Sequence, residues 1–73
     1  MIDADALQAR IARLGEVALE LHQDAMRFRR NDAPMARQER FDVAAKLEDA
    51  AEGAGRAREV LAQVLDRLAK KKG

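Results

Sequence analysis

Apolar residues recur in steps of three and four along almost the whole chain, and this spacing is interrupted only once, near the centre. Such a heptad pattern is typical of long helices that pack lengthwise against one another. The first run consists of Ala4, Leu7, Ile11, Leu14, Ala18, Leu21, Ala25 and Phe28. The second run consists of Val43, Leu47, Ala50, Ala54, Ala57, Leu61, Val64 and Leu68.

The interruption coincides with residues that favour a turn. Asn31 and Asp32 are common in turns, and Pro34 cannot continue a helix. The pattern therefore predicts an all-α, antiparallel helical hairpin that forms a single domain over residues 1–73. The expected elements are a helix over about 3–30, a loop over about 31–34, a helix over about 35–70 and a basic tail over 70–73.

The N-terminal end of the first helix carries a recognisable capping signal. Asp3 can cap the helix by accepting a hydrogen bond from a backbone N–H of the first turn. Ile2 and Leu7 stand at the two positions of a hydrophobic staple. These residues predict that the first helix begins at about residue 3.

Folding the chain back at Pro34 aligns the two apolar runs. Antiparallel pairing then places Leu7 beside Leu61 and Ala18 beside Ala50, and brings Gly15 level with Gly53. The alignment predicts large apolar layers near the ends of the hairpin and a narrow waist of small residues in the middle.

Gly53 and Gly55 stand inside the second predicted helix and allow two interpretations. Two glycines cost a helix about 2 kcal/mol relative to alanine, so the helix could break or kink there. Alternatively, the glycines let another helix approach closely. We favour the second interpretation, because strong helix formers flank both glycines and the heptad spacing passes through them unchanged.

The apolar stripe of the second helix is wider than a two-helix contact requires. A two-helix hairpin alone leaves much of its apolar surface wet, so the width suggests a homodimer that forms a coiled-coil-like four-helix bundle. The alternative is that a different protein supplies the missing helices. The expected self-association residues are Gly15, Ala18, His22, Ala44, Ala51, Gly53 and Leu65.

The residue types argue against an enzyme. The chain contains no serine, threonine, cysteine or tyrosine, so hydroxyl and thiol nucleophiles are absent. His22 is the only histidine, and its neighbours Glu20 and Asp24 lack the Glu-x-x-His spacing of bundle metal sites. We therefore expect no catalytic residues, no metal site and no cofactor.

Five arginines gather around the predicted loop and form the best candidate contact patch, which we call the arginine-rich bend. Arginine grips phosphates, and the nearby Phe28 and Phe41 could stack on bases, so nucleic-acid binding is one interpretation. The other is a contact with a larger protein partner, with the two phenylalanines closing the end of the bundle. The five residues are Arg27, Arg29, Arg30, Arg37 and Arg40.

The length, the central loop and the alanine-rich heptads resemble the Rop-like antiparallel helical hairpins. The layout is also similar to small helical co-chaperones of type III secretion needle subunits. The Rop resemblance implies a dimeric four-helix bundle that binds RNA through the middle of the first helix. Here that region carries Glu16, Glu20 and Asp24, and an acidic surface repels phosphate.

Together these features predict a small, non-enzymatic interaction protein that serves as an adaptor, accessory subunit or regulator. The N-terminal residues lack the basic and apolar regions of a signal peptide, and no stretch is apolar enough to span a membrane. We therefore expect a cytoplasmic protein with no membrane contact. The alternatives are a nucleic-acid-binding regulator and a small co-chaperone that completes its core with a partner's helices.

Overall fold

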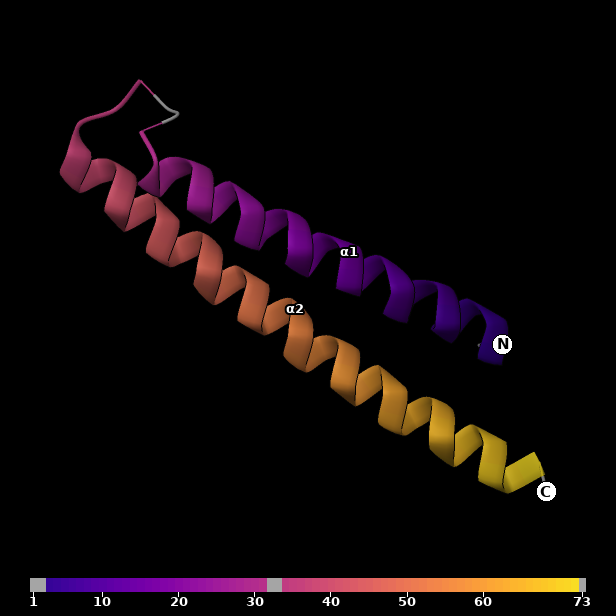
Figure 1. Ribbon diagram of the computed structural model, residues 1–73. Coiled ribbons are helices and arrows are strands. Elements are labelled where there is room, and N and C mark those ends of the chain that lie inside the picture. The colour runs from indigo at the N-terminus through magenta and orange to yellow at the C-terminus, as the bar shows by residue number, and fades with distance from the viewer. Residues whose placement is uncertain (1–2, 32–33, 73) are drawn as a thin grey trace.

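The computed structural model describes residues 3–31 and 34–72 and consists of two long helices (Figure 1). Helix α1 spans Ala4–Arg29, and helix α2 spans Arg37–Lys72. The helices pack side by side and are antiparallel, and both extend away from the bend that joins them, so the two chain ends lie at the far end of the rod. The molecule is a rod of 55 × 17 × 14 Å. The predicted all-α antiparallel hairpin is therefore confirmed.

Both ends of α1 are capped by local backbone chemistry. The Asp3 carboxylate accepts a hydrogen bond of 2.8 Å from the N–H of Ala6, as the sequence predicts for an N-cap. At the other end, Asn31 has a φ of 69°, the left-handed conformation that commonly ends a helix. The N–H of Asn31 donates to the carbonyl of Phe28. The staple partner Ile2 lies outside the described residues.

Helix α2 begins two residues later and ends later than the sequence predicts. Its first turn starts at Arg37, where the N–H of Arg40 donates to the carbonyl of Ala36 at 3.0 Å. Its last turn extends to Lys72, so the terminal lysines belong to the helix rather than to a separate tail. An ion pair of 3.2 Å between Lys70 and Asp66, one turn apart, supports this end.

Gly53 and Gly55 do not break α2. The helix is continuous over its 36 residues, and neither glycine has a positive φ. Arg56 pairs with Glu52 at 4.0 Å across the glycine segment. A Cβ built on either glycine would meet no atom within 4 Å, so the space beside both is open. The helix therefore continues through both glycines, as favoured from the sequence, and the alternative of a break is wrong; the cause is the strong helix-forming sequence on both sides.

The apolar run predicted for α1 is covered by α2 along its whole length. Leu7 is 3% exposed and Ala25 has no exposed surface. The other members of the run, from Ala4 to Phe28, are partly covered. This half of the predicted interface is correct because α1 has one pronounced apolar stripe, and only that stripe can face a neighbouring helix.

In α2, the sequence predicts that two rows of apolar residues face α1. One of them does, and the other is displaced by one residue along the sequence. Leu47, Ala54, Leu61 and Leu68 are partly covered, as predicted. The second covered row contains Ala44, Ala51 and Leu65, in which Ala44 has no exposed surface; Arg58, in the same row, is exposed. The predicted row instead lies at the border of the interface: Val43 is half-buried, while Ala50, Ala57 and Val64 are exposed.

The shifted row has a simple physical cause. Helix α2 carries three adjacent apolar rows, but a single neighbouring helix covers only two of them. The spacing of apolar residues alone does not determine which two rows are covered. The shift also changes the middle of the hairpin, where a Cβ on Gly15 would lie 3.7 Å from the guanidinium of Arg58 rather than beside Gly53. A Cβ on Gly53 would meet no atom within 4 Å, so the two glycines do not pack against each other.

Candidate functional site

An exposed apolar surface on α2 is the main candidate site, and we call it the valine face. Its members form two neighbouring rows next to the covered interface, so they share one side of the helix. Val60 is 56% exposed and Val64 is 38% exposed, and Gly53 leaves an open gap between the side chains. The valine face consists of Val43, Ala50, Gly53, Ala57, Val60 and Val64.

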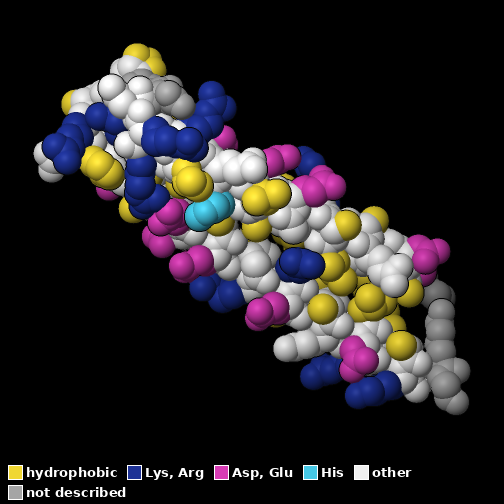
Figure 2. All heavy atoms as spheres, viewed as in Figure 1, with side chains coloured by type: hydrophobic (Ala, Val, Ile, Leu, Met, Phe, Trp, Pro, Cys, Tyr) yellow, Lys and Arg dark blue, Asp and Glu magenta, His cyan; other side chains and the backbone are white. Residues whose placement is uncertain are grey.

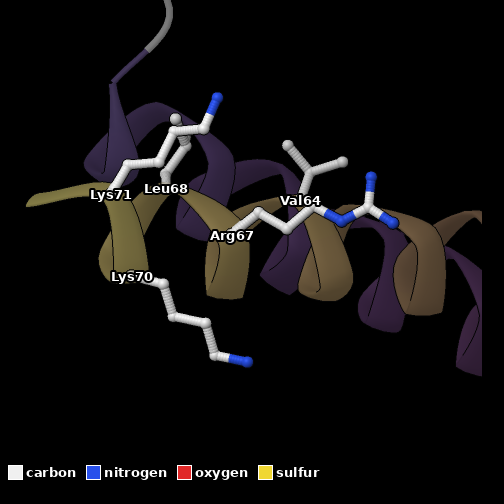
Figure 3. A pocket seen from close by; sticks show the side chains of 5 residues that line it. All are labelled: Val64, Arg67, Leu68, Lys70 and Lys71. Atoms are coloured by element: carbon white, nitrogen blue, oxygen red, sulfur yellow. The ribbon is translucent and has the colours of Figure 1, made fainter.

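The valine face extends towards the C-terminal end of α2 into an open hollow (Figure 3). The hollow has a volume of about 450 Å³ and is lined by Val64, Arg67, Leu68, Lys70 and Lys71. Val64 and Leu68 supply its apolar part, and the cationic side chains surround them. Figure 3 shows that Lys70 and Lys71 leave the helix in opposite directions. The hollow therefore combines an apolar floor with a basic rim.

The opposite flank of the hairpin carries polar residues and an ion pair between the two helices. Arg29 on α1 donates two hydrogen bonds to Glu48 on α2, and the one from Nη2 to Oε2 measures 3.1 Å. This hydrogen bonding raises the pKa of Arg29 and lowers the pKa of Glu48 below its ordinary value. The pair fixes the two helices relative to each other near the bend.

Arg40 is the most deeply buried charged residue among the described residues. It is 9% exposed, and its Nη1 donates to the carbonyl of Phe28 at 3.2 Å. This contact satisfies a carbonyl at the C-terminal end of α1, where backbone acceptors lack helical partners. Its Nε is buried and has no hydrogen-bond partner in the part of the chain that the structure describes. Arg40 therefore stabilises the contact between the two helices of the hairpin.

The remaining arginines of the bend lie on the surface. Figure 2 shows basic side chains gathered at this end of the rod. Arg30 donates from Nε to the carbonyl of Met26 at 3.4 Å, and the guanidinium of Arg37 lies 5.5 Å from the centroid of the Phe41 ring. Arg27 is exposed. The arginine-rich bend is therefore only partly available for a partner, because Arg29 and Arg40 are engaged within the hairpin.

His22 lies at the polar flank and has no metal-binding environment. It borders a shallow hollow of about 380 Å³ together with Glu48, Ala51 and Glu52. No group of three His, Cys, Asp or Glu side chains in residues 3–31 and 34–72 could hold a metal ion.

The residues predicted for self-association fall into two groups. One group lies between the two helices of the hairpin: Ala44 has no exposed surface, and Ala18, Ala51 and Leu65 are partly covered. The other group lies at the border of the interface or beyond it and consists of Gly15, His22 and Gly53. Of the seven, Gly53 alone belongs to the valine face.

Val60 belongs to neither predicted apolar run, although it is among the most exposed large hydrophobic residues of the described chain. The signal that reveals it is the spacing Gly53, Ala57, Val60, Val64, a second set of steps of three and four parallel to the first.

No protein-family model matches this chain, and the searches found no significantly similar curated protein or solved structure. Among the described residues, neither helix is apolar enough over a sufficient length to cross a membrane.

Proposed function

We propose that this chain is a small, non-catalytic protein-interaction module, an adaptor, accessory subunit or regulator, whose hairpin is completed by further helices. The simplest source of those helices is a second copy of the chain, which would give a four-helix bundle. The observation that carries the proposal is the valine face, an exposed apolar row beside an interface that is already occupied.

The surface area of the hairpin supports association. The chain exposes 5701 Å², whereas a compact monomer of 8.1 kDa exposes about 4,500 Å². The excess of roughly 1,200 Å² exceeds the roughly 800 Å² that each partner buries in a standard interface. The radius of gyration is 16.4 Å, against about 11 Å for a compact chain of this length. The hairpin thus exposes enough surface beyond that of a compact monomer to form an interface of standard size.

The core of the hairpin is small. Among the described residues only Leu7, Ala25 and Ala44 are buried hydrophobics, and two of these three are alanines. A buried leucine contributes about 1.5–3 kcal/mol, and an alanine contributes much less. Chains of this size commonly gain the missing stability by oligomerisation.

Sedimentation of the pure protein over a wide concentration range tests the proposal, with helicity followed by circular dichroism. We expect a helical dimer that loses helicity when it is diluted enough to dissociate. A monomer that is poorly helical at every concentration would instead point to helices supplied by another protein, as in a co-chaperone. A monomer that stays fully helical and unfolds cooperatively at every concentration would contradict the proposal.

A second candidate is a nucleic-acid-binding regulator that acts through the arginine-rich bend. The observation that favours it is the exposure of Arg27, Arg30 and Arg37 at one end of the rod (Figure 2). The test compares the wild type with the double variant Arg27→Glu, Arg30→Glu, which leaves Arg29 and Arg40 in place. Affinity for RNA or DNA that falls steeply with salt and is lost in the variant would support this function. No measurable affinity of the wild type would exclude it.

A further inference from the structure

We propose that two copies associate through their α2 valine faces, antiparallel, about a two-fold axis that passes between Gly53 and Ala57. This inference rests on the proposed function, because it specifies how a second copy completes the bundle. The second copy is the occupant that the charge and geometry of α2 favour.

The charge distribution along α2 makes the helix complementary to itself when it is reversed. Residues 37–54 contain five acidic and three basic side chains, whereas residues 55–72 contain two acidic and six basic ones. An antiparallel copy places each acidic half beside a basic half. A parallel copy places like charges side by side, which is unfavourable.

In this arrangement, central residues of the valine face of one copy lie opposite residues of the valine face of the second copy. With the axis between Gly53 and Ala57, Val60 lies opposite Ala50 of the second copy, and Ala57 lies opposite Gly53 of the second copy. At the centre of the contact, a larger residue thus lies opposite a smaller one. Because a Cβ at Gly53 would meet nothing within 4 Å, the two helix backbones are free to approach closely there.

In the same register, residues of the second copy reach the hollow at the C-terminal end of α2. Val43 of the second copy arrives opposite Arg67, next to the apolar floor of Val64 and Leu68. Glu39 of the second copy arrives opposite Lys71 on the rim. The hollow therefore receives a valine on its floor and a carboxylate at its edge.

The axis also uses the full length of the helix. It falls within one residue of the midpoint of Arg37–Lys72, so the two α2 helices overlap over nearly their entire length of about 54 Å. Arg56 from both copies comes near the axis, and this repulsion is offset because each Arg56 lies 4.0 Å from Glu52 of its own chain.

The opposite flank is a poorer surface for a second copy. Helix α1 exposes Leu19 and Met26 at 58% and 42%. That flank also carries Glu48 and Glu52 of α2 around the hollow at His22, so two copies meeting there would bring acidic groups together. The valine face combines exposed apolar side chains with a charge distribution that is complementary to itself.

A matched pair of substitutions locates the contact. Val60 and Leu19 have almost the same exposure, 56% and 58%, so the variants Val60→Glu and Leu19→Glu introduce a charge at equally accessible positions. We expect Val60→Glu to weaken the dimer at least about tenfold, while Leu19→Glu sediments as the wild type. Dissociation by Leu19→Glu and not by Val60→Glu would overturn the proposal.

Spin labels then determine the orientation, and the absence of cysteine allows labelling at single introduced sites. In the proposed dimer, labels on Gln38→Cys lie about 50 Å apart along the direction of the helices, and labels on Glu59→Cys about 12 Å, at 1.5 Å per residue. Similar short distances at both positions would mean a parallel pair and would refute the arrangement. A wild-type protein that never dimerises would instead refute self-association itself.

Discussion

At the scale of single residues, two arginines hold the hairpin together near the bend in different ways. Arg29 forms a two-pronged ion pair with Glu48 at the surface, while Arg40 is buried and bonds to the carbonyl of Phe28. Buried arginines contribute through the packing of their aliphatic stems as well as through their charge. Both residues lie in a cluster that, from sequence, has the appearance of a binding patch.

Replacing Arg40 separates these contributions. We expect Arg40→Ala to lower the free energy of unfolding by about 1–3 kcal/mol, because it removes both the stem and a charged hydrogen bond. Arg40→Met keeps the stem and removes a buried charge, so it should cost less. Urea denaturation of both variants measures the difference. Equal losses in the two variants would show that the stem contributes nothing.

The ion pair between Arg29 and Glu48 makes the stability of the folded chain depend on pH in the acidic range. The pKa of Glu48 is lowered in the folded chain, chiefly by its hydrogen bonds to Arg29, so the stabilisation is present above the unfolded pKa. It is lost as the pH falls through the lowered folded value. Arg29 stays charged throughout. We expect Glu48→Gln to show a smaller loss of thermal stability below about pH 4.5 than the wild type, and an unchanged acid profile would contradict this.

At the scale of the helices, α2 is longer than α1 and has a wider apolar surface. It carries three adjacent apolar rows, and α1 covers two of them. Gly53 and Gly55 stand side by side in the sequence but face different surroundings, because Gly53 belongs to the valine face and Gly55 lies on the opposite flank. Open space beside both glycines means that neither is required by contacts within the hairpin.

Substituting Gly55 tests this interpretation. We expect Gly55→Ala to raise the free energy of unfolding by up to about 1 kcal/mol, because alanine favours the helix and its methyl group meets no atom. Thermal unfolding at a fixed protein concentration measures the gain. A loss of stability would show that Gly55 packs closely against another chain.

Gly53 provides the contrast. In the proposed dimer it faces the axis, so Gly53→Leu should weaken the association by about tenfold or more through crowding. The same substitution at Gly55 should leave the association nearly unchanged. Sedimentation of the two leucine variants compares them directly, and equal effects would place the axis elsewhere.

At the scale of the whole molecule, the chain is a rod of 55 × 17 × 14 Å with opposite charges on the two halves of its longer helix. If complementary charge orients the dimer, salt should weaken it, because the screening length falls from about 10 Å at 0.1 M to about 3 Å at 1 M. We expect the dissociation constant to rise several-fold over this range. A dimer that only tightens with salt would be held by apolar contact alone.

Much of the fold can be predicted from the sequence, and the candidate site only partly. The hairpin, the Asp3 cap and the covered stripe of α1 follow from spacing and from backbone chemistry that act over a few residues. The predicted second row of α2 is displaced by one position, and Val60 is not singled out. Both depend on how α2 is rotated about its own axis, which no local signal specifies.

The sequence by itself determined that two helices form, where the chain turns and that glycines inside a strong helix former do not break it, because these outcomes depend on local propensity and period. The tertiary structure decided that Ala44 rather than Val43 is fully buried, that Arg40 is enclosed and that the valine face remains open. The physical reason is that one helix has room for only two of three apolar rows, and the choice is made by packing across the interface.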